Sequence, residues 1–494
     1  MAQAPRHRPQ QLPFTIAAFR MTEPTSDTFR DSQAPGSPDL MTLRPYLFVV
    51  LECDRPAAGG ARYALSGVEE IVIGRGPERR ATRQITGGIS RLIVSVPGRS
   101  MSSTHARLLH TGDGWVVEDA HSTNGSYVNG HNVDRAVLRD DDVLELGHTL
   151  FLLRSAIPAP LATPEDLDSA DLTLELPGFS TLVPAAAPDL ASLGRIAKSN
   201  ISILLLGETG TGKEVIARSV HVISGRKGPF IALNCGAIPA NLVESQLFGH
   251  QKGSFSGAVK DEQGLIRAAD DGTLLLDEIG DLPAPAQPAL LRFLQENEVT
   301  PVGGARPYKV DVRVVAATHQ PLAQLVDKRE FRADLFARLG GFTHAVSSLR
   351  HRREDLGLLI ARILARREPQ HPPMAIAPAA GRQLLRHDWP ANIRELEQAL
   401  VRGLTLAGGG IVETRHLFVG GATGLAPPAT ADEPIGEQKP LSETDAKLRR
   451  ELLLLLEHHK GNVSDVARAL GKARMQVQRW IKRYEIDLNL FRQR

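Results

Sequence analysis

Hydrophobic and polar positions alternate in different ways along the chain. From about residue 46 to 155, short apolar runs such as LFVVLE, RLIVSV and TLFLLR are separated by turns rich in Gly, Asn, Asp and Ser. Runs of this length and spacing are typical of strands and predict an all-β sandwich. From about residue 181 to 420, apolar strands instead alternate with amphipathic helical stretches. This second pattern indicates an α/β domain with a parallel sheet.

The remaining segments are expected to be a tail, two linkers and a helical domain. Residues 1–43 lack hydrophobic periodicity and are expected to be disordered. Residues 157–180 are proline-rich and acidic, and residues 421–440 are rich in Pro, Ala and Gly, which are linker compositions. Helical patterns broken at Gly461 and Gly471 occupy residues 441–494. We therefore expect three folded domains, at residues 44–156, 181–420 and 441–494.

Composition agrees with this division. A chain of 494 residues has room for about three domains at roughly 100 to 200 residues each. With 42% hydrophobic and 23% charged residues and no apolar run of about 20 residues, it has neither the composition of a disordered chain nor a membrane span, and we expect a cytoplasmic protein. Its two cysteines, Cys53 and Cys235, lie far apart and support neither a disulfide framework nor a zinc site.

A glycine-rich segment joins a strand to a helix in the middle domain. In ISILLLGETGTGKEVIARSVH, the strand precedes Gly207 and the helix follows Lys213. Such a loop aims backbone N–H groups at phosphate oxygens, and its lysine neutralises the β- and γ-phosphates. The candidate phosphate-binding residues are Gly207, Glu208, Thr209, Gly210, Thr211, Gly212, Lys213 and Glu214. Glu214 stands where a serine or threonine is usual, so that hydroxyl ligand for Mg²⁺ is missing.

A second motif, GTLLLDEIGDLP, is an apolar strand that ends in two carboxylates. Asp277 is suited to hold Mg²⁺ through water, and Glu278 to polarise the water that attacks ATP. Two carboxylates at a strand end can also be solvated turn residues, but the upstream phosphate loop favours catalysis. We therefore expect this domain to bind and hydrolyse ATP, with Mg²⁺ as its metal.

Several motifs of the middle domain occur in a family-specific order. GETGTGKE, LNCGAI, ESQLFGHQKGSFSGA, GTLLLDEIGDLP, RVVAATHQ, FRADLFARL and WPANIRELE resemble the bacterial enhancer-binding AAA+ family, the activators of sigma-54 RNA polymerase. The resemblance covers about residues 181 to 420, includes Glu214, and implies an α/β P-loop ATPase with a helical lid that assembles into a ring, expected to be a hexamer.

The same resemblance assigns roles to further polar residues. It makes Asn234 the switch that holds Glu278, and it places Thr318 in sensor I, where His319 follows in place of the more usual asparagine. It directs Arg332 and Arg338 at the ATP site of the neighbouring subunit, and Arg394 becomes the sensor II arginine. An arginine supplied in trans can increase the rate by about 10³- to 10⁵-fold. For each arginine alone, a surface ion pair is the commoner explanation.

The front domain carries turn motifs that resemble those of the forkhead-associated (FHA) domain. These are IVIGR, SMSSTHARL and VEDAHSTNGSYVNG, within about residues 46 to 155. The resemblance implies a phosphothreonine site with Arg75, Ser102, Thr123 and Asn124 as ligands, Ser103 as a further candidate, and His105 as a brace. A guanidinium, hydroxyls and an amide suit a phosphate group. The alternative is that these are only the turns of a sandwich without a ligand.

The last segment is basic, with twelve Lys and Arg against seven Asp and Glu from Ser442 onward. KGNVSDVARALGKARMQVQRWIKRYEI resembles the Fis-type helix-turn-helix, an all-α fold that binds double-stranded DNA. The candidate DNA-contacting residues are Arg474, Gln476, Gln478, Arg479, Lys482 and Arg483. A small helical dimerisation module is the alternative, and the two can coexist.

A loop of small residues carries one large ring. GSFSGA, which comprises Gly253, Ser254, Phe255, Ser256, Gly257 and Ala258, resembles the family's GAFTGA loop, which contacts sigma-54. Flanking glycines favour a movable loop, although Phe255 could also fold back on its own domain.

Together, the resemblances predict an activator of sigma-54 holoenzyme that a Ser/Thr kinase controls through a phosphothreonine protein or through a phosphorylated threonine in the chain's own tail. The alternatives are a phosphopeptide-responsive DNA-binding regulator that acts without sigma-54, and a general AAA+ unfoldase.

Overall fold

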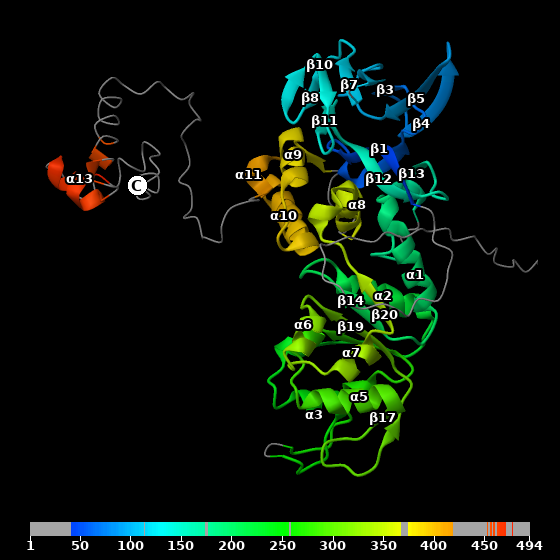
Figure 1. Ribbon diagram of the computed structural model, residues 1–494, viewed down its shortest axis with the longest axis vertical. Coiled ribbons are helices and arrows are strands. Elements are labelled where there is room, and N and C mark those ends of the chain that lie inside the picture. Colours follow the sequence, from blue (N-terminus) through cyan, green and yellow to red (C-terminus); the bar gives the residue numbers. More distant parts are fainter. Residues whose placement is uncertain are drawn as a thin grey trace, which may run out of the picture. The chain divides into compact units, whose positions relative to one another are not determined.

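The computed structural model describes residues 41–112, 114–172, 176–255, 258–366 and 374–417, together with short stretches between 452 and 477. Its contacts divide the chain into two units, Met1–Gly421 and Ala422–Arg494. The first unit holds a β-sandwich, an α/β core and a helical lid (Figure 1). These are the fold classes that the first two domains were predicted to have.

Two sheets form the sandwich at the front of the chain. The seven-stranded sheet contains, in spatial order, β13 (Asp166–Asp168), β2 (Ala61–Ala64), β1 (Met41–Glu52), β12 (Thr149–Pro160), β11 (Val143–Leu146), β8 (Ser126–Val128) and β9 (His131–Val133). The six-stranded sheet contains β10 (Arg135–Leu138), β7 (Gly114–Asp119), β6 (Ala106–Thr111), β3 (Glu70–Arg75), β5 (Ile89–Val96) and β4 (Arg80–Thr86).

The predicted limits of the sandwich need correction at both ends. Strand β1 begins at Met41, inside the segment predicted to be a disordered tail. The predicted linker at 157–180 contains the end of β12 and all of β13, which pairs antiparallel with β2. Proline and acidic residues suggested a linker, but a strand at the edge of a sheet leaves one side unpaired and tolerates both. The segment therefore belongs to the folded body.

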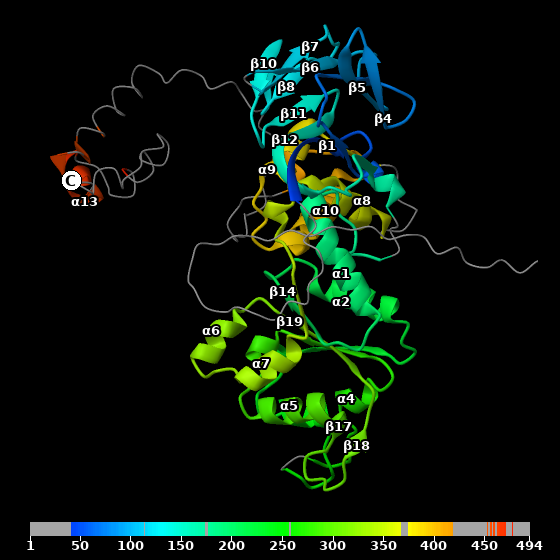
Figure 2. The ribbon, with the colours of Figure 1, turned by 45° about the vertical axis from the view of Figure 1, so that its right-hand side comes forward.

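A five-stranded parallel sheet organises the α/β core, in the order β15 (Phe230–Asn234), β16 (Thr273–Asp277), β19 (Arg313–Thr318), β14 (Ile203–Leu206) and β20 (Phe342–Ala345). Helices around it are α1 (Ala187–Ala197), α2 (Lys213–Ser224), α3 (Val243–Phe248), α4 (Leu265–Ala268), α5 (Ala286–Glu296), α6 (Leu322–Asp327) and α7 (Ala333–Leu339). Figure 2 shows α1 and α2 beside β14, and α5 and α7 farther along the core. The short pair β17 (Glu298–Val299) and β18 (Tyr308–Lys309) lies outside the main sheet.

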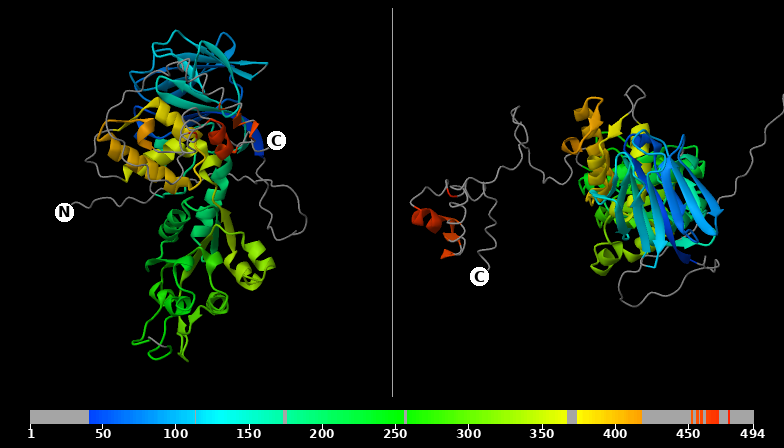
Figure 3. Two further views of the ribbon diagram at one scale, coloured as in Figure 1. Left: turned by 90° about the vertical axis from the view of Figure 1, so that its left-hand side faces the viewer. Right: turned by 90° about the horizontal axis from the view of Figure 1, so that it is seen from above.

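The lid follows the core and is mostly helical. It consists of α8 (Leu356–Ala365), α9 (Pro378–Arg386), α10 (Asn392–Ala407) and α11 (Thr414–Leu417), with the small parallel pair β21 (Ala375–Ile376) and β22 (Ile411–Val412). Figure 3 shows these helices from two further directions, next to the sandwich.

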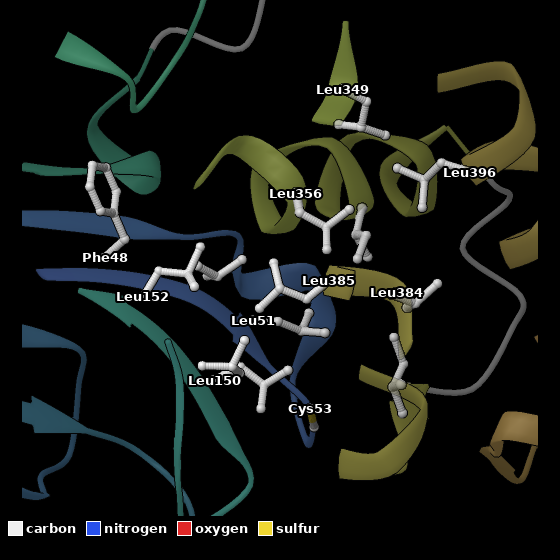
Figure 4. Packing of buried hydrophobic residues seen from close by; sticks show 14 of the residues in the cluster. Phe48, Leu51, Cys53, Leu150, Leu152, Leu349, Leu356, Leu384, Leu385 and Leu396 are labelled. Atoms are coloured by element: carbon white, nitrogen blue, oxygen red, sulfur yellow. The ribbon is translucent and has the colours of Figure 1, made fainter. Parts of the chain in front are cut away.

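The sandwich and the lid share one hydrophobic core. Along β1, Phe48 and Val50 face the lid, while Leu47 and Val49 face the interior of the sandwich. Strand β12 alternates in the same way, and its lid-facing side chains join the same cluster. Figure 4 shows Leu51, Leu150 and Leu152 of the sandwich beside Leu356, Leu384 and Leu385 of the lid, and Phe48 at one side of the same cluster. Both faces of the seven-stranded sheet are therefore buried at its two central strands, β1 and β12.

In the second unit the structure describes helix α13 (Val463–Ala469), together with single helical positions outside it such as Leu452 and Leu456. Leu452, Leu456, Val466 and Val477 are fully buried there. The helices of the described regions are all too short or too polar to cross a membrane.

Candidate functional site

The phosphate loop lies between β14 and α2, as predicted. Gly210 and Gly212 have φ of +80° and +98°, a conformation that glycine adopts without strain. A Cβ at position 210 would also lie 2.1 Å from the carbonyl oxygen of Ala391 in the lid. The loop therefore needs a glycine at 210 both for its own turn and for the close approach of the lid.

Lys213 begins α2 and is buried, with 6% of its surface exposed. Its Nζ donates to the carbonyl oxygens of Gly207 and Glu208, at 2.7 and 3.2 Å. Burial lowers the pKa of Lys213, and the nearby carboxylates of Glu278 and Asp277 oppose that shift. The Lys213 amino group thus lies against the loop, with the two acids close enough to influence its pKa.

The two acids stand at the carboxyl end of β16. Burial and the neighbouring Glu278 raise the pKa of Asp277, whose Oδ1 accepts a hydrogen bond from the Glu278 N–H at 3.1 Å. Glu278 has a φ of +50°, and its Oε2 accepts from His319 Nδ1 at 2.7 Å and from the His319 N–H at 3.2 Å. Glu278, the predicted catalytic carboxylate, is therefore held by His319, which directly follows Thr318.

The structure does not join Asn234 to Glu278. Asn234 lies opposite Asp277 in the sheet, but its Oδ1 accepts from the N–H groups of Gly236 and Ala237, at 3.0 and 3.1 Å. Thr318 is buried at the end of β19, and its Oγ1 accepts from the Gln320 N–H. Parallel strands bring these carboxyl ends to one edge of the sheet, where open α/β sheets bind their ligands.

The lid covers the other side of the phosphate loop. The N–H groups of Ile393 and Arg394 donate to the Gly210 carbonyl, at 3.0 and 3.3 Å. Asn392, which is fully buried, donates to Glu208 Oε2 and to the Thr209 carbonyl, each at 3.1 Å. Bonds from Arg350 and Asn392 lower the pKa of Glu208 to about 2.

A cleft of about 300 Å³ lies between the loop, the acids and the lid. Besides Lys213, Glu214, Asp277, Glu278 and Arg394, it is lined by residues that sequence analysis missed: Pro177, Gly178, Ser180, Val215, Ile216, Arg352, Leu359, Arg362, Ile363, Arg366, Ile393 and Glu397. The segment from Pro177 to Ser180 had been taken for a linker. The lid arginines carried no local motif that could have marked them.

This cleft suits a polyphosphate with an apolar group attached. Arg362 Nε and Nη2 and Arg352 Nε are buried, and no residue that the structure describes accepts from them. Ile216, Leu359 and Ile363 give the cleft an apolar wall. In the described regions no three His, Cys, Asp or Glu side chains come together as a group that could hold a metal ion.

Arg332 and Arg338, predicted to act on a neighbouring subunit, do not line this cleft in the part of the chain that the structure describes. Arg332 pairs with Asp334 at 2.7 Å on the surface, and Arg338 Nε donates to the Leu294 carbonyl at 3.0 Å. Both are exposed on or beside α7.

The loop at 253–258 is a tight turn at its base. The Gly253 N–H donates to the Ala258 carbonyl at 2.9 Å, and the Ala258 N–H donates to the Phe255 carbonyl at 3.1 Å. Phe255 is 37% exposed, and its ring meets the His250 ring edge-on at 5.0 Å. Ser256 and Gly257 lie outside the described residues. The ring is thus presented to solvent while one edge rests on its own domain.

The candidate phosphothreonine residues come together at one end of the sandwich. The Arg75 N–H donates to the Ser102 carbonyl at 2.8 Å, and the Thr123 N–H donates to Ser102 Oγ at 3.1 Å. The side chains of Arg75, Ser103, Thr123 and Asn124 are exposed. The backbone bonds therefore bring three loops to one surface and leave a guanidinium and hydroxyls facing outward.

His105 and Asn124 hold these loops in place. His105 is fully buried, its Nε2 lies 3.1 Å from the Gly125 carbonyl, and burial lowers its pKa. Asn124 Nδ2 donates to the Ser100 carbonyl at 2.8 Å. The predicted DNA-contacting residues, Arg474, Gln476, Gln478, Arg479, Lys482 and Arg483, lie outside the described residues.

Four family models match the chain. They are the Sigma-54 interaction domain at residues 184–344, the AAA+ ATPase lid domain at 350–423, the FHA domain at 71–147 and a Homeodomain-like domain at 443–488. Each falls in the region where the sequence pattern predicted a domain of that kind.

Curated relatives match mainly the middle of the chain. The DNA-binding transcriptional regulator NtrC of Escherichia coli K12 is 40% identical over 334 residues, which are 63% of this chain and 71% of NtrC. The acetoin catabolism regulatory protein of Cupriavidus necator is 42% identical over 305 residues, 60% of this chain and 45% of the relative. The chain thus spans less than half of the latter protein. Crystal structures of NtrX from Brucella abortus share 30% identity over 60% of this chain and 66% of NtrX, with a TM-score of 0.44.

Proposed function

This chain belongs to the family of sigma-54-interacting AAA+ transcriptional activators, and from that premise we propose that it uses ATP to remodel sigma-54 RNA polymerase under the control of a phosphothreonine signal. The observation that carries the proposal is the single cleft that Lys213, Asp277, Glu278 and Arg394 line together. Its residue types are those that phosphoryl transfer to water requires.

In this proposal each residue of the cleft has one task. The N–H groups of the glycine-rich loop and the Lys213 ammonium neutralise charge on the β- and γ-phosphates. Glu278 orients the attacking water and accepts its proton, at a position fixed by His319. Bound Mg²⁺ would add positive charge to the phosphates, and Asp277 is the side chain that would hold it.

Arg332 and Arg338 are proposed to complete the site of an adjacent subunit in a ring, because both lie on the surface away from their own cleft. Hydrolysis would then depend on assembly. We expect a hexamer, by analogy with the family.

The loop with Phe255 is the proposed contact with sigma-54. Its ring lies at the surface of a turn whose base is held by backbone bonds, and the proposal is that this loop changes position when the core does. The C-terminal segment would bind double-stranded DNA, which keeps the ATPase near its promoter. Because polymerase and DNA are the partners, we expect the protein in the cytoplasm.

The surface formed by Arg75, Ser102, Ser103, Thr123 and Asn124 is the proposed phosphothreonine site. Its support is the convergence of three loops that leaves Arg75, Ser103, Thr123 and Asn124 exposed, with Ser102 partly exposed between them. A Ser/Thr kinase would then supply the signal, with a phosphoprotein as the ligand.

The experiment is open-complex formation at a sigma-54 promoter with purified polymerase, this protein and ATP, after its ATPase activity has been demonstrated. We expect ATP-dependent open complexes from the wild type, and none from Phe255→Ala at an unchanged ATPase rate. Val259→Ala is the matched control, because Val259 is near the loop and 78% exposed. An active ATPase that yields no open complex would instead favour a regulator that acts without sigma-54.

A further inference from the structure

The sandwich and the lid meet along backbone as well as side chains. A Cβ at Gly357 of α8 would lie 1.9 Å from the Val50 carbonyl oxygen of β1, so helix and strand touch without a side chain between them. The Ile376 N–H of β21 donates to the Cys53 carbonyl at 2.7 Å. Contacts this close, around a shared hydrophobic core, allow little relative movement.

Charged side chains surround this core and cross the same boundary. Arg154 Nε of β12 donates to Glu354 at 2.6 Å, and Arg353 reaches Asp141 at 3.3 Å. Arg382 of α9 pairs with Glu145 of β11.

The segment between sandwich and core is also fixed to the lid. Asp355, which is 1% exposed, accepts from Thr181 Oγ1 at 2.7 Å and from the Leu182 N–H at 2.6 Å. Arg62 of β2 donates to the Leu182 carbonyl at 2.9 Å. The segment is therefore held from both sides by buried bonds.

One of these contacts begins next to the candidate phosphothreonine site. Thr123 and Asn124 are separated from β8 only by Gly125, and β8 ends at the turn formed by Asn129 and Gly130. Arg386 Nη2 of α9 donates to the Asn129 carbonyl at 2.8 Å. The Arg382 side chain lies close to Gly130, where a Cβ would come within 3.3 Å of its Nε. One short strand thus connects the loop proposed to bind phosphate with helix α9.

The other end of the lid touches the phosphate loop. The Asn392 side chain forms hydrogen bonds with three different residues. Its Nδ2 donates to Glu208 and Thr209, and its Oδ1 accepts from the Leu349 N–H at 2.8 Å. Arg352 Nη2 donates to the Thr211 carbonyl at 3.2 Å. The lid therefore contacts the residues proposed to surround the nucleotide phosphates.

From these contacts we propose that the front sandwich and the lid form one rigid body, so that phosphothreonine and nucleotide each change the affinity of the other. The proposal rests on the proposed function of the two sites. A chain of contacts is not enough for coupling, which also requires an element with two positions that both ligands favour unequally. The lid is such an element. Only polar bonds join it to the phosphate loop, so its position relative to that loop can change, whereas a shared hydrophobic core fixes it to the sandwich.

The test measures binding of a pool of phosphothreonine peptides, degenerate at the flanking positions, to the full-length protein with and without ATPγS. The same pool without phosphate gives the background. We expect ATPγS to change the peptide Kd by at least about fivefold, within the usual range of coupling between sites. By linkage, the peptides must change the Kd of ATPγS by the same factor.

The variant Arg382→Ala/Arg386→Ala removes contacts between α9 and the sandwich without altering either site. We expect it to bind the peptides as the wild type does and to show a smaller effect of ATPγS, because the shared hydrophobic core remains. Arg415→Ala, a 73% exposed lid arginine that pairs with Glu413, is the matched control and should retain the effect. Charge exchange in Glu145→Arg/Arg382→Glu should restore part of what Arg382→Glu alone removes.

Each result decides a different claim. If the wild type binds the phosphorylated pool no better than the background, both the phosphothreonine function and the coupling fail. If it binds with the same Kd at all ATPγS concentrations, the function stands and the coupling is wrong. If coupling persists undiminished in Arg382→Ala/Arg386→Ala, it does not pass through the bonds of these arginines to Glu145 and Asn129, and the proposed role of that contact is wrong.

Discussion

The helical lid meets two neighbours in different ways. Against the sandwich it buries leucines from α8 and α9 in a core that continues into β1 and β12. Against the phosphate loop it makes hydrogen bonds through Asn392, Arg350 and the N–H groups at the start of α10, beside an open cleft. Burial of apolar surface is worth about 25 cal/mol per Å², whereas a hydrogen bond that replaces one to water contributes only about 1 kcal/mol net.

The difference indicates which neighbour the lid follows when it moves. Polar bonds at the rim of a cleft can be exchanged for bonds to water or to a ligand at little cost. Separation of the sandwich would instead expose the shared core. Although the lid follows the ATPase core in sequence, it belongs mechanically to the front domain.

The largest expected effect comes from Glu278→Gln, which leaves both faces of the lid intact. The amide cannot accept a proton, so the rate of ATP hydrolysis should fall by about 10²- to 10⁴-fold, the usual contribution of a general base. ATP should still bind, and the steady-state release of phosphate measures the loss. A variant that hydrolyses ATP normally would remove Glu278 from its proposed role.

The apolar face is tested by Leu385→Ala. Leu385 is 1% exposed within the shared core, and truncation of such a leucine costs about 2 to 5 kcal/mol. Denaturant unfolding of the full chain should show sandwich and lid destabilised together. Leu406→Ala, at a 53% exposed position of α10, should have little effect. Loss of stability in the lid alone would mean that the two do not share one core.

The polar face is tested by Asn392→Gly, since glycine keeps the positive φ of +55° at that position. The buried Leu349 N–H loses its bond, at a cost of about 1 to 3 kcal/mol, whereas Glu208 and Thr209 are accessible enough to bond to water instead. We expect weaker binding of ATPγS in a titration, with the unfolding of the sandwich unchanged. Unfolding of the sandwich at lower denaturant would contradict the separation of the two faces.

The last expected effect is on the pH dependence of stability and arises from His344, in the strand next to β14. Burial, with a contribution from Arg352, lowers the pKa of His344 in β20 from 6.5 to about 4. Because the folded-state pKa lies below the unfolded one, this stability is fully present above pH 6.5 and is lost as the pH falls toward 4. The wild type should therefore lose more stability than His344→Asn between these values. Equal losses in parallel denaturation curves would exclude His344 as the cause.

Much of the site could be predicted from local motifs. The loop from Gly207 to Lys213 and the acids at the end of β16 each lie within a short strand-and-turn pattern, and their positions follow from the parallel sheet. His319 was noted in the sequence, but its bond to Glu278 was not, because sequence spacing does not give side-chain direction. Arg352 and Arg362 were missed for a related reason, since only the folded lid brings them to the cleft.

The contact between sandwich and lid was not predicted, although the sequence contains a signal for it. In β1, LFVVLE is apolar at successive positions, and a strand with one face in water would alternate with polar residues. The run shows that both faces are covered without showing by what. The proline-rich composition of residues 157–180 then suggested separate domains, whereas the structure places Thr181 and Leu182 against buried Asp355.

A single engineered disulfide tests the rigid-body claim most directly. A Cβ at position 381 of α9 would lie 2.9 Å from the Sγ of Cys53 in the sandwich, so Gly381→Cys places a second thiol within bonding reach. If the two parts move as one body, oxidised Gly381→Cys should hydrolyse ATP and couple ATPγS to phosphothreonine peptides as the reduced form does, with Gly381→Ser as the uncrosslinked control. Loss of either property on oxidation and its recovery with reductant would show that sandwich and lid must separate during function, and would contradict the account.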